Sequence, residues 1–481
     1  MEMETARTSG LKILPETRYL SRYTLTKLLP FLSILLPLLI LFHVQSSPAF
    51  TYPTYTSSLS WPFSKLRKTA NSSSSSKVVE ILTAKLKDSV TFLPLKDLRY
   101  TTTAMEGNTW FMSSLAATLE ENEALHIYFP SNSSKGRVLC IKGRHTSDGT
   151  NNSYALAWPE ALPPSATLLE GLTFVSDTYY DYENICHGLS AIAPFVGWSM
   201  KNQCLRPSRW VLFHWGELRT KMGSWVWNLA RNHFGDATVE IFGKGDGPYC
   251  FEKAVLMRHN LGGMGDQKRL RVFGLMRCKA REACGLDPLG TGRELNEAGA
   301  PIIRLTLLSR KGARSFKNEE VVKGIFGKEC EMVEGCVFSV VQLGDLSFCD
   351  QVKVMTNTDI VASPHGAQLT NLIFLDQGSS VMEFFPKGWL EHAGQGQYVY
   401  HWMANQSGMK HEGAWRDPIG EDCPNPEQEG MQCFLQFHKD SKIGHNETYF
   451  AEWARKVLNE VRVGKLEQAS KEKVKSSACE C

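Results

Sequence analysis

The chain has 481 residues, more than one compact core usually holds, so its length predicts two or three domains. Apolar residues make up 42% of the sequence, and 12 residues are Trp, which is typical of a globular protein. Lys and Arg number 53 against 50 Asp and Glu, which leaves a net charge of only +3. This balance excludes a general electrostatic attraction to nucleic acid as the basis of function.

Near the beginning of the chain, residues 28–44 form a run without Asp, Glu, Lys or Arg, LLPFLSILLPLLILFHV. As a helix it would extend roughly 25 Å, enough for a thin early-secretory membrane. Basic residues precede the run, and the next one after it is Lys65, which places the amino terminus in the cytosol. We therefore predict a cytosolic tail over 1–27 and an uncleaved transmembrane signal anchor over 28–44. A cleaved signal peptide is the alternative, although its charged leader would be long and no small-x-small site follows.

Residues 45–77 are rich in Ser, Thr and Pro, a composition that cannot bury enough apolar surface to fold. They predict a flexible stem that holds the remainder away from the membrane, on its lumenal side. Five sequons for N-linked glycosylation agree with a lumenal location: Asn71, Asn132, Asn151, Asn405 and Asn446.

The 13 cysteines contain no CxxC pair, which argues against zinc. Disulfides are their expected state in a lumenal protein, and the odd number leaves at least one thiol free or in an intermolecular bond. We expect Cys479 and Cys481 to be unpaired residues of a charged tail, 466–481, that has no regular structure.

The pattern of apolar residues over 78–295 predicts one α/β domain. Short apolar runs at 124–129 and 210–213 indicate strands, and residues 185–198 and 224–232 indicate helices.

Residues 296–465 have a more regular pattern. Four near-continuous apolar strands alternate with helices, an order that predicts a parallel, doubly wound sheet. The strands are expected at 302–308, 337–341, 360–362 and 379–385, and the helices at 318–326, 347–355, 367–375 and 452–461. Ligands of such sheets bind at the carboxyl ends of the strands.

One of those strand ends carries the sequence Ser363-Pro-His-Gly366. A glycine there allows a ligand to approach the backbone, and the first turn of the next helix offers free amide groups and a partial positive charge. Such a junction suits a diphosphate, to which His365 could donate a hydrogen bond. The alternative is an ordinary strand-to-helix turn with a satisfied histidine.

A second strand end, at Ser309, is followed by Arg310 and Arg314. Two guanidinium groups facing the junction would clamp a pyrophosphate from both sides. A solvated basic loop is the alternative reading.

Taken together, these segments resemble the catalytic domain of glycosyltransferase family 61, over about residues 170–460. The blocks that carry the resemblance are Ser309-Arg310 through Asn318-Glu319, Gln351 to Met355, Asp359 to Asn371 and Met382-Glu-Phe-Phe-Pro386, with Cys250 to Val255, Arg258 to Met264 and Arg277 to Arg281 similar to plant members. The resemblance implies an inverting enzyme of two facing Rossmann-like domains, the GT-B arrangement. Plant relatives are Golgi enzymes that add xylose or arabinose from UDP donors to xylan or to N-glycans.

The resemblance also implies roles for individual residues. By this resemblance, the diphosphate is expected to contact Arg310, Arg314, His365 and the amides of Gly366 and Ala367. Other nucleotide-sugar contacts fall to Ser363, Thr370, Asn371 and Glu383, the last as a possible ribose partner. No Asp-x-Asp pair occurs in the chain, so neither a metal nor another cofactor is expected.

Inversion requires a general base for the acceptor hydroxyl. Relatives often carry His-x-x-x-Asp, and here the histidine is His187 while the acid position holds Ala191. His187 is the predicted base, with Asp177 and Asp181 as substitutes. A buried helix histidine without a catalytic role is the alternative.

We therefore expect a type II Golgi membrane glycosyltransferase that transfers a sugar, xylose or arabinose, from a UDP-sugar to xylan, another cell-wall polysaccharide or a glycoprotein. A nucleotide-sugar-binding protein that no longer transfers is the first alternative. A nucleotide-sugar-modifying enzyme is the second, but it would carry Gly-x-Gly-x-x-Gly where this chain has Ser309-Arg310. The irregular segment 389–415 is expected to form an acceptor-side loop.

Overall fold

The computed structural model describes residues 73–98, 120–143, 148–177, 184–242, 247–257, 263–290, 294–424, 430–469 and 479. It divides the chain into two compact units, Met1–Lys77 and Val78–Cys481. The tail and anchor expected over 1–44, and Asn71, lie outside the described residues. Within the described part, none of the helices is both long and apolar enough to cross a membrane.

Helix α3, Ser73–Asp88, is the first described element. The helix begins within the serine run and so overlaps the end of the stem expected over 45–77. The strong helix formers of this segment, Leu, Ala, Glu and Lys, lie further along the helix, between Glu80 and Lys87.

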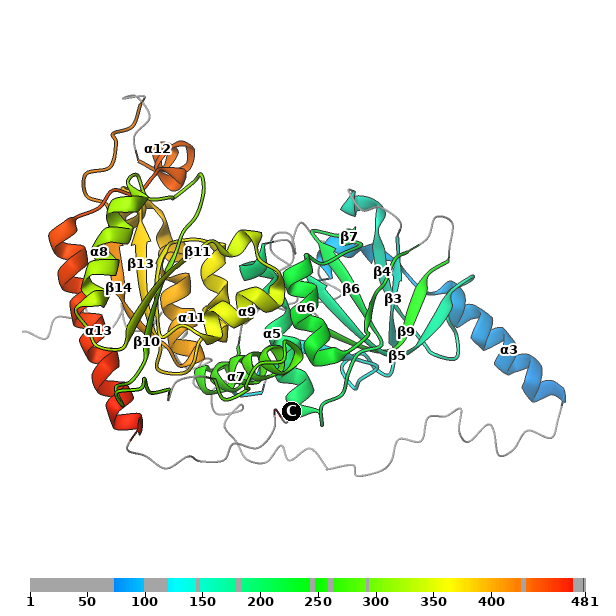
Figure 1. Ribbon diagram of the computed structural model, residues 1–481. Coiled ribbons are helices and arrows are strands. Elements are labelled where there is room, and N and C mark those ends of the chain that lie inside the picture. Colours follow the sequence, from blue (N-terminus) through cyan, green and yellow to red (C-terminus); the bar gives the residue numbers. More distant parts are fainter. Residues whose placement is uncertain are drawn as a thin grey trace, which may run out of the picture. The chain divides into compact units, whose positions relative to one another are not determined.

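The first sheet of the second unit contains nine strands (Figure 1). The pairs β9-β5, β5-β6 and β6-β8 are parallel. The pairs β1-β4, β4-β3, β3-β9, β2-β9 and β6-β7 are antiparallel. The sheet is thus mixed, and only its central part has the Rossmann-like character that was expected. The strands are β1 Leu93–Pro94, β2 His126–Phe129, β3 Val138–Lys142, β4 Ser153–Ala157, β5 Thr167–Asp177, β6 Arg209–His214, β7 Glu217–Arg219, β8 Thr238–Val239 and β9 Tyr249–Met257.

Three helices cover one face of this sheet: α5 (Ile185–Lys201), α6 (Ser224–Phe234) and α7 (Asp266–Ala283). The first two match the expected helices. Helix α5 begins where the Asn184 side chain accepts a hydrogen bond from the Cys186 amide, an N-cap that the sequence supplies directly. Its residues from Ala191 to Ser199 are all buried, so it lies inside the protein rather than on its surface.

The second sheet has five strands, all parallel, in the order β11-β10-β12-β13-β14. The first four lie within two residues of the predicted strands: β10 Ile303–Leu308, β11 Cys336–Val341, β12 Ile360–Pro364 and β13 Ser380–Phe385. The predicted parallel sheet is confirmed. The fifth strand, β14 (Lys410–Arg416), was not predicted.

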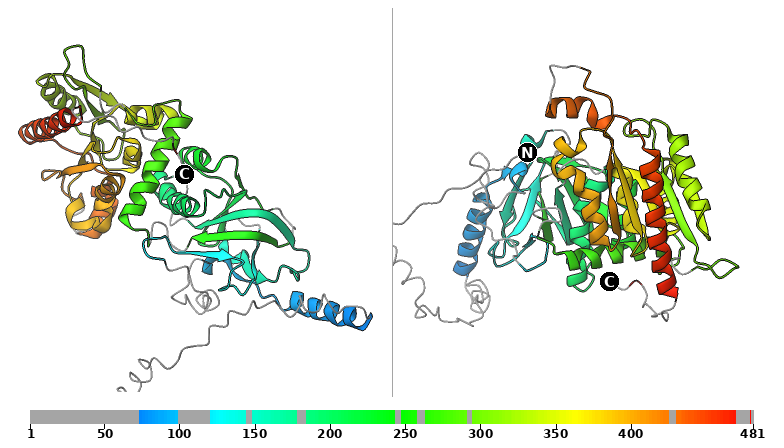
Figure 2. Two further views of the ribbon diagram at one scale, coloured as in Figure 1. Left: turned by 90° about the horizontal axis from the view of Figure 1, so that it is seen from below. Right: turned by 90° about the vertical axis from the view of Figure 1, so that its left-hand side faces the viewer.

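Both faces of the second sheet are covered, as a doubly wound arrangement requires. Helices α8 (Glu319–Glu331) and α13 (Glu447–Ala469) pack on one face, and Figure 2 shows α13, in red, running along the sheet. The other face is covered by α9 (Phe348–Thr356), the 3₁₀ helix η4 (Ala367–Phe374) and α11 (Val399–Ser407). The shorter elements are η1 Leu95–Asp97, η2 Gly149–Asn151, η3 Leu343–Asp345, α10 Trp389–His392, η5 Gly394–Tyr398, α12 Met431–Gln436 and η6 His438–Asp440.

The segment 389–415, expected to be an irregular loop, is folded instead as α10, η5, α11 and β14. The buried Trp389, Tyr400 and Met403 explain the difference, because they anchor these short elements on the second sheet although Gly, His and Gln are frequent there. An acceptor-side role for it remains a prediction.

A single hydrophobic core joins helices α5 to α7 with α9, η4 and α11 of the second sheet. The Trp225 indole donates to Asn371 Oδ1 at 3.0 Å and its rings meet Phe348 and Phe374. A disulfide between Cys284 and Cys349 joins α7 to α9. The helices of the two sheets are thus packed as one body within Val78–Cys481.

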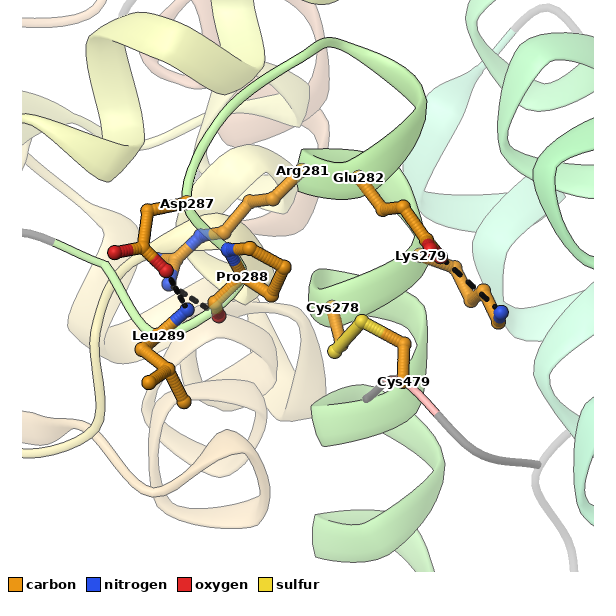
Figure 3. Close-up of a disulfide and its surroundings, with 8 residues drawn as sticks. All are labelled: Cys278, Lys279, Arg281, Glu282, Asp287, Pro288, Leu289 and Cys479. Atoms are coloured by element: carbon orange, nitrogen blue, oxygen red, sulfur yellow. Dashed lines mark hydrogen bonds and ion pairs between the residues drawn. A yellow bond between two sulfur atoms is a disulfide. The ribbon is translucent and has the colours of Figure 1, made fainter. Parts of the chain in front are cut away.

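The prediction that Cys479 is unpaired was wrong. Cys479 forms a disulfide with Cys278 on α7, beside the ion pair of Lys279 and Glu282 (Figure 3). The physical reason is that α7 presents Cys278 on a partly exposed face where the chain can return after α13. Other disulfides among the described residues join Cys140 to Cys250, Cys330 to Cys336 and Cys423 to Cys433, while Cys186 is a free thiol.

Candidate functional site

The strand order of the second sheet reverses between β10 and β12, since the chain moves from β10 outward to β11 and then returns to the other side of β10. At such a switch point the loops after the two strands diverge and leave a crevice at their carboxyl ends, where ligands of doubly wound sheets bind. Ser309-Arg310 follows β10, and His365-Gly366 follows β12. The two segments singled out from the sequence therefore flank the switch point.

The guanidinium group of Arg310 lies directly on the junction after β12. Its Nη1 donates to the carbonyl oxygen of His365 at 2.9 Å. A Cβ atom at Gly366 would collide with this Nη1 and would lie 3.7 Å from Arg314 Nη1. Both arginines thus reach the glycine, and only glycine leaves room for them. We call His365, Gly366, Arg310 and Arg314 the switch-point corner.

The positive charge at the corner is only partly balanced. Burial and the neighbouring Arg314 lower the pKa of Arg310 to about 10, and burial also lowers the pKa of Arg314. The Nε atoms of both are sealed from solvent without a hydrogen-bond partner, and the nearest carboxylate oxygen, of Asp440, is 3.8 Å from Arg314 Nε. Two guanidinium groups held together beside one distant carboxylate favour an anionic ligand.

The backbone of Arg314 is in the left-handed region, with φ of 58°, which is costly for a residue other than glycine. Its amide donates to the carbonyl oxygen of Asp440 at 3.2 Å, and its guanidinium lies over the Trp389 ring at 5.6 Å. These contacts hold an unfavourable conformation that directs the side chain to the corner.

Behind the corner, a buried carboxylate links two histidines. His365 Nδ1 lies 2.6 Å from Glu383 Oε1, and His411 Nε2 lies 2.9 Å from Glu383 Oε2. Glu383 is in the middle of β13 and has no exposed surface. Burial opposes its ionisation, but the hydrogen bonds from the two histidines outweigh this effect and lower the pKa of Glu383.

The ring of His365 is enclosed by aromatic side chains. Its centroid lies 4.7 Å from that of Phe385, 4.5 Å from Trp389 and 5.2 Å from Tyr400. Burial lowers the pKa of His365 in spite of Glu383, and the two arginines lower it further. The imidazole is therefore mainly neutral at physiological pH in this structure.

The remaining predicted contacts lie deeper. Ser363 is buried, and its hydroxyl accepts from Gln368 Nε2 at 2.9 Å. Asn371 is 1% exposed; its Oδ1 accepts from Trp225, and its Nδ2 donates to the Gln368 carbonyl oxygen. The structure thus brings Arg310, Arg314, His365 and Gly366 together, with Ala367 next to them, and places Ser363 and Asn371 in the packing beneath.

Thr370 is also fully buried. The Thr370 hydroxyl and the Cys186 thiol lie near the Tyr400 hydroxyl. Burial raises the pKa of Tyr400 well above its usual value, and these two neighbours also influence it. Thr370 Oγ1 itself does not reach hydrogen-bonding geometry with a described residue. Cys186 belongs to α5, so the beginning of α5 faces the corner across Tyr400.

Helix η4 is 3₁₀ rather than α-helical, and its first internal bond runs from Leu369 N to Gly366 O. The amides before Leu369, including that of Ala367, therefore stay outside its ladder.

His187 follows Cys186 in the first turn of α5, on the helix that packs against η4. Its role as base remains a prediction. Ala191 is buried in the core, so no acid stands one turn further on. Asp177 ends β5 with a carboxylate oxygen 3.8 Å from His214 Nδ1, and Asp181 lies outside the described residues.

Sequence reasoning missed His411 and Tyr400. Both come from the segment expected to be irregular, where no apolar period marked a strand or a helix. Trp389 was recognised only as one of many tryptophans. No simple alternation could have found His411, because β14 shifts register against β13 between Val381 and Glu383 and so places His411 and Trp415 on different faces.

Four predicted glycosylation sites, Asn132, Asn151, Asn405 and Asn446, have exposed side chains. Among the described residues, no group of three His, Cys, Asp or Glu side chains could hold a metal ion. A cavity of about 340 Å³ lies away from the corner, beside the carboxyl end of α5, and is lined by Ser199, Arg206, His233 and Lys279 among others.

The fold is that of an α/β protein whose second, doubly wound sheet carries two arginines at its switch point. Residues 174–382 match the sequence model of the family described as Glycosyltransferase 61. The match includes His187, Arg310, Arg314, His365 and Gly366, and the resemblance stated from the sequence is confirmed.

Curated relatives carry the name protein O-linked-mannose beta-1,4-N-acetylglucosaminyltransferase 2. The dog protein (Canis lupus familiaris) is 33% identical over 94 residues, 19% of this chain and 16% of its own length. The mouse protein (Mus musculus) is 31% identical over 132 residues, 27% and 21% of the two chains. The human protein is 44% identical over 82 residues, 17% and 13%. The aligned segments thus span about a fifth or less of these relatives.

Proposed function

We propose that this chain is an inverting glycosyltransferase and that the switch-point corner binds the diphosphate of a nucleotide-sugar donor. The observation that carries the proposal is the convergence of the Arg310 and Arg314 Nη1 atoms on Gly366, beside the switch point of the second sheet. A diphosphate would accept from those guanidinium groups and neutralise their mutual repulsion. As the sugar leaves, the same groups would stabilise the negative charge that grows on the diphosphate.

The acceptor would approach from the side of α5, where His187 is the proposed base. The first turn of helix α5, which contains Cys186, lies next to Tyr400. An acceptor bound between the helices of the first sheet and the corner would therefore contact the beginning of α5 and the donor. The mixed first sheet and the parallel second sheet support a GT-B type arrangement, in which donor and acceptor sites belong to different sheets.

Two donor classes deserve testing. The plant-like sequence blocks favour a UDP-pentose, xylose or arabinose, with xylan, another cell-wall polysaccharide or a glycoprotein as acceptor. The names of the curated relatives favour UDP-N-acetylglucosamine and a protein-linked glycan. A panel of UDP-sugars with xylan, N-glycan and O-mannosyl acceptors, read by mass spectrometry, separates these classes. Binding without transfer or hydrolysis of any donor would instead support the nucleotide-sugar-binding alternative.

We further propose that the enzyme acts in the Golgi lumen as a type II membrane protein anchored by residues 28–44. The disulfides among the described residues support an oxidising compartment. The exposed sequons are compatible with it. Protease protection and endoglycosidase treatment of the full-length chain in microsomes test this orientation.

The sharpest test of the corner is Arg310→Ala. It should weaken binding of UDP by about 1–3 kcal/mol, roughly 5- to 150-fold in Kd, because a charge-assisted hydrogen bond is lost. Lys311→Ala is the matched control, since the Lys311 side chain is 81% exposed and lies 3.6 Å from Asp345 rather than at the corner. Calorimetry measures the affinity of both variants for UDP. Equal affinities of Arg310→Ala and the unmodified protein would contradict the proposal that Arg310 binds the diphosphate.

A further inference from the structure

The carboxylate of Glu383 is the feature from which a further inference follows, and the inference rests on the proposed function. A buried carboxylate is unfavourable unless hydrogen bonds compensate it. Here the compensation comes from His365 and His411, which occupy one oxygen each. An ionised carboxylate only accepts, so the proton of His365 is on Nδ1 and that of His411 on Nε2.

With Nδ1 protonated, the other ring nitrogen of His365 carries a lone pair in the neutral form. His365 Nε2 has no hydrogen-bond partner among the described residues and is not one of the polar atoms sealed from solvent. Arg310 donates to the backbone oxygen of the same residue, and both guanidinium groups lie close enough to the ring to lower the pKa of His365. We therefore assign Nε2 to the side of the ring that would meet a diphosphate at the corner. A lone pair there can accept a hydrogen bond but cannot donate one to a phosphate oxygen.

The conflict is resolved if His365 gains a proton when the anion binds. Without the anion, burial and two neighbouring guanidinium groups disfavour an imidazolium. A diphosphate would reverse this balance, because its negative charges neutralise the arginines and accept from Nε2. Glu383 already stands on the far side of the ring to stabilise the positive charge, as carboxylates do for positioned histidines in other sites.

We propose that binding of a nucleotide diphosphate at the corner draws one proton from solvent onto His365 Nε2, and that Glu383 is the positioning residue that makes this possible. The protonated ring then donates Nδ1–H to Glu383 and Nε2–H to a diphosphate oxygen. No bond breaks in this step, and the proton comes from the solvent. This assignment replaces the ribose contact expected of Glu383, whose oxygens are both occupied by imidazoles.

Several other charged or titratable groups surround this pair, and the test has to separate them from His365. They are Arg310 and Arg314 from the loop after β10, Tyr400 from α11, His411 from β14, and, one contact further away, Cys186, His401 and Asp440. Of these, His411 and His401 are the two other imidazoles. His401 is exposed on α11, and its ring centroid lies 5.0 Å from that of His411, so it serves as a control.

The first experiment is calorimetry of the purified full-length chain with UDP-xylose and with UDP-N-acetylglucosamine. These donors are chosen over UDP because their diphosphate does not titrate near neutral pH. Titrations near neutral pH in buffers of different ionisation enthalpy give the number of protons taken up. We expect uptake by the unmodified protein and by His401→Gln, a reduced uptake by Glu383→Gln, and none by His365→Gln, which should still bind weakly through the arginines.

The second experiment needs no variant, so it decides the question even if Glu383→Gln fails to fold. Because binding takes up a proton, the affinity should rise as the pH falls, by up to about tenfold per pH unit between the free and bound pKa of His365. Donor binding without proton uptake, or uptake that persists in His365→Gln, overturns this proposal and leaves the proposed function intact. Failure of every UDP-sugar to bind contradicts the proposed function itself.

Discussion

At the scale of single residues, Gly366 determines whether the two arginines can meet the diphosphate. Its φ of 156° is rarely adopted by other residues, and the space beside it is filled by the Arg310 guanidinium. The sequence predicted a glycine that lets a ligand approach the backbone. In the structure the closest neighbours of Gly366 are the arginines that would hold that ligand.

Gly366→Ala should therefore reduce stability, because alanine is strained at this φ, and should reduce donor affinity as well. The added methyl group would push the flexible end of Arg310 away from the His365 carbonyl, while the strands on either side stay paired. We expect an affinity loss of about 1–3 kcal/mol, comparable with that of Arg310→Ala. Calorimetry and thermal unfolding measure the two effects separately.

Gly344→Ala is the control for this substitution, because Gly344 has a negative φ and no atom lies within 4 Å of an added Cβ. It should bind donor normally. If Gly366→Ala also binds normally, the glycine is required by chain geometry alone and the corner is not shaped for an anion.

Much of the site could be predicted at this scale, and the missing part has a physical reason. Arg310, Arg314, His365 and Gly366 were found because they follow apolar strands, which a local pattern reveals. The roles of Glu383 and Asn371 could not be found, because a polar residue in an apolar stretch looks the same whether it meets a ligand or another buried side chain. Only the positions of His411 and Trp225 decide between these possibilities.

At the scale of elements, helix α7 acts as a support for η4. Arg277 Nε donates to the Ile373 carbonyl at 3.1 Å and its Nη2 to the Ser407 carbonyl at 3.0 Å. Arg281 donates to the Phe374 carbonyl at 2.6 Å and pairs with Asp376 at 2.7 Å. These cations meet the carboxyl ends of η4 and α11, where free carbonyl groups carry a partial negative charge. They thereby fix η4, whose other end carries Gly366.

Arg277→Met should lower the free energy of unfolding by about 2–4 kcal/mol, because two buried carbonyl groups lose their donor. Burial and the neighbouring Arg281 lower the pKa of Arg277 to about 10, so the group remains charged at neutral pH. Urea unfolding measures the change. Arg271→Met, exposed on the same helix, should have little effect, and an equal loss in both variants would contradict the support role.

The secondary structure was predictable where burial is continuous. Strands β10, β12 and β13 are buried along almost their whole length and were located to within about two residues. Helix α7 and strand β14 escaped, because their composition is rich in charged and polar residues and their burial comes from contacts with distant segments. An α-helix was expected after Gly366, and the structure has a 3₁₀ helix there. The spacing of apolar residues in the sequence does not distinguish these two kinds of helix.

At the scale of the molecule, the disulfides reinforce a core that both sheets share. The bond between Cys284 and Cys349 spans 65 residues, whereas that between Cys330 and Cys336 spans six. A longer loop loses more freedom in the unfolded chain when it is closed, so the first bond should stabilise more.

Replacing Cys284 and Cys349 with Ser should lower the free energy of unfolding by about 2–4 kcal/mol, and replacing Cys330 and Cys336 by less. Chemical denaturation under non-reducing conditions measures both pairs. Donor affinity should persist in each variant, since neither bond touches the corner. The opposite order of stabilities would show that native contacts rather than loop closure determine the effect.

The bond between Cys278 and Cys479 has a different consequence, because it turns the chain between these residues into a covalent ring that includes the entire second sheet. One proteolytic cut in an exposed turn of that ring, for example next to Ile419, would release nothing. The cleaved protein would migrate as a single band on a gel without reductant and separate into two pieces only when thiol is added.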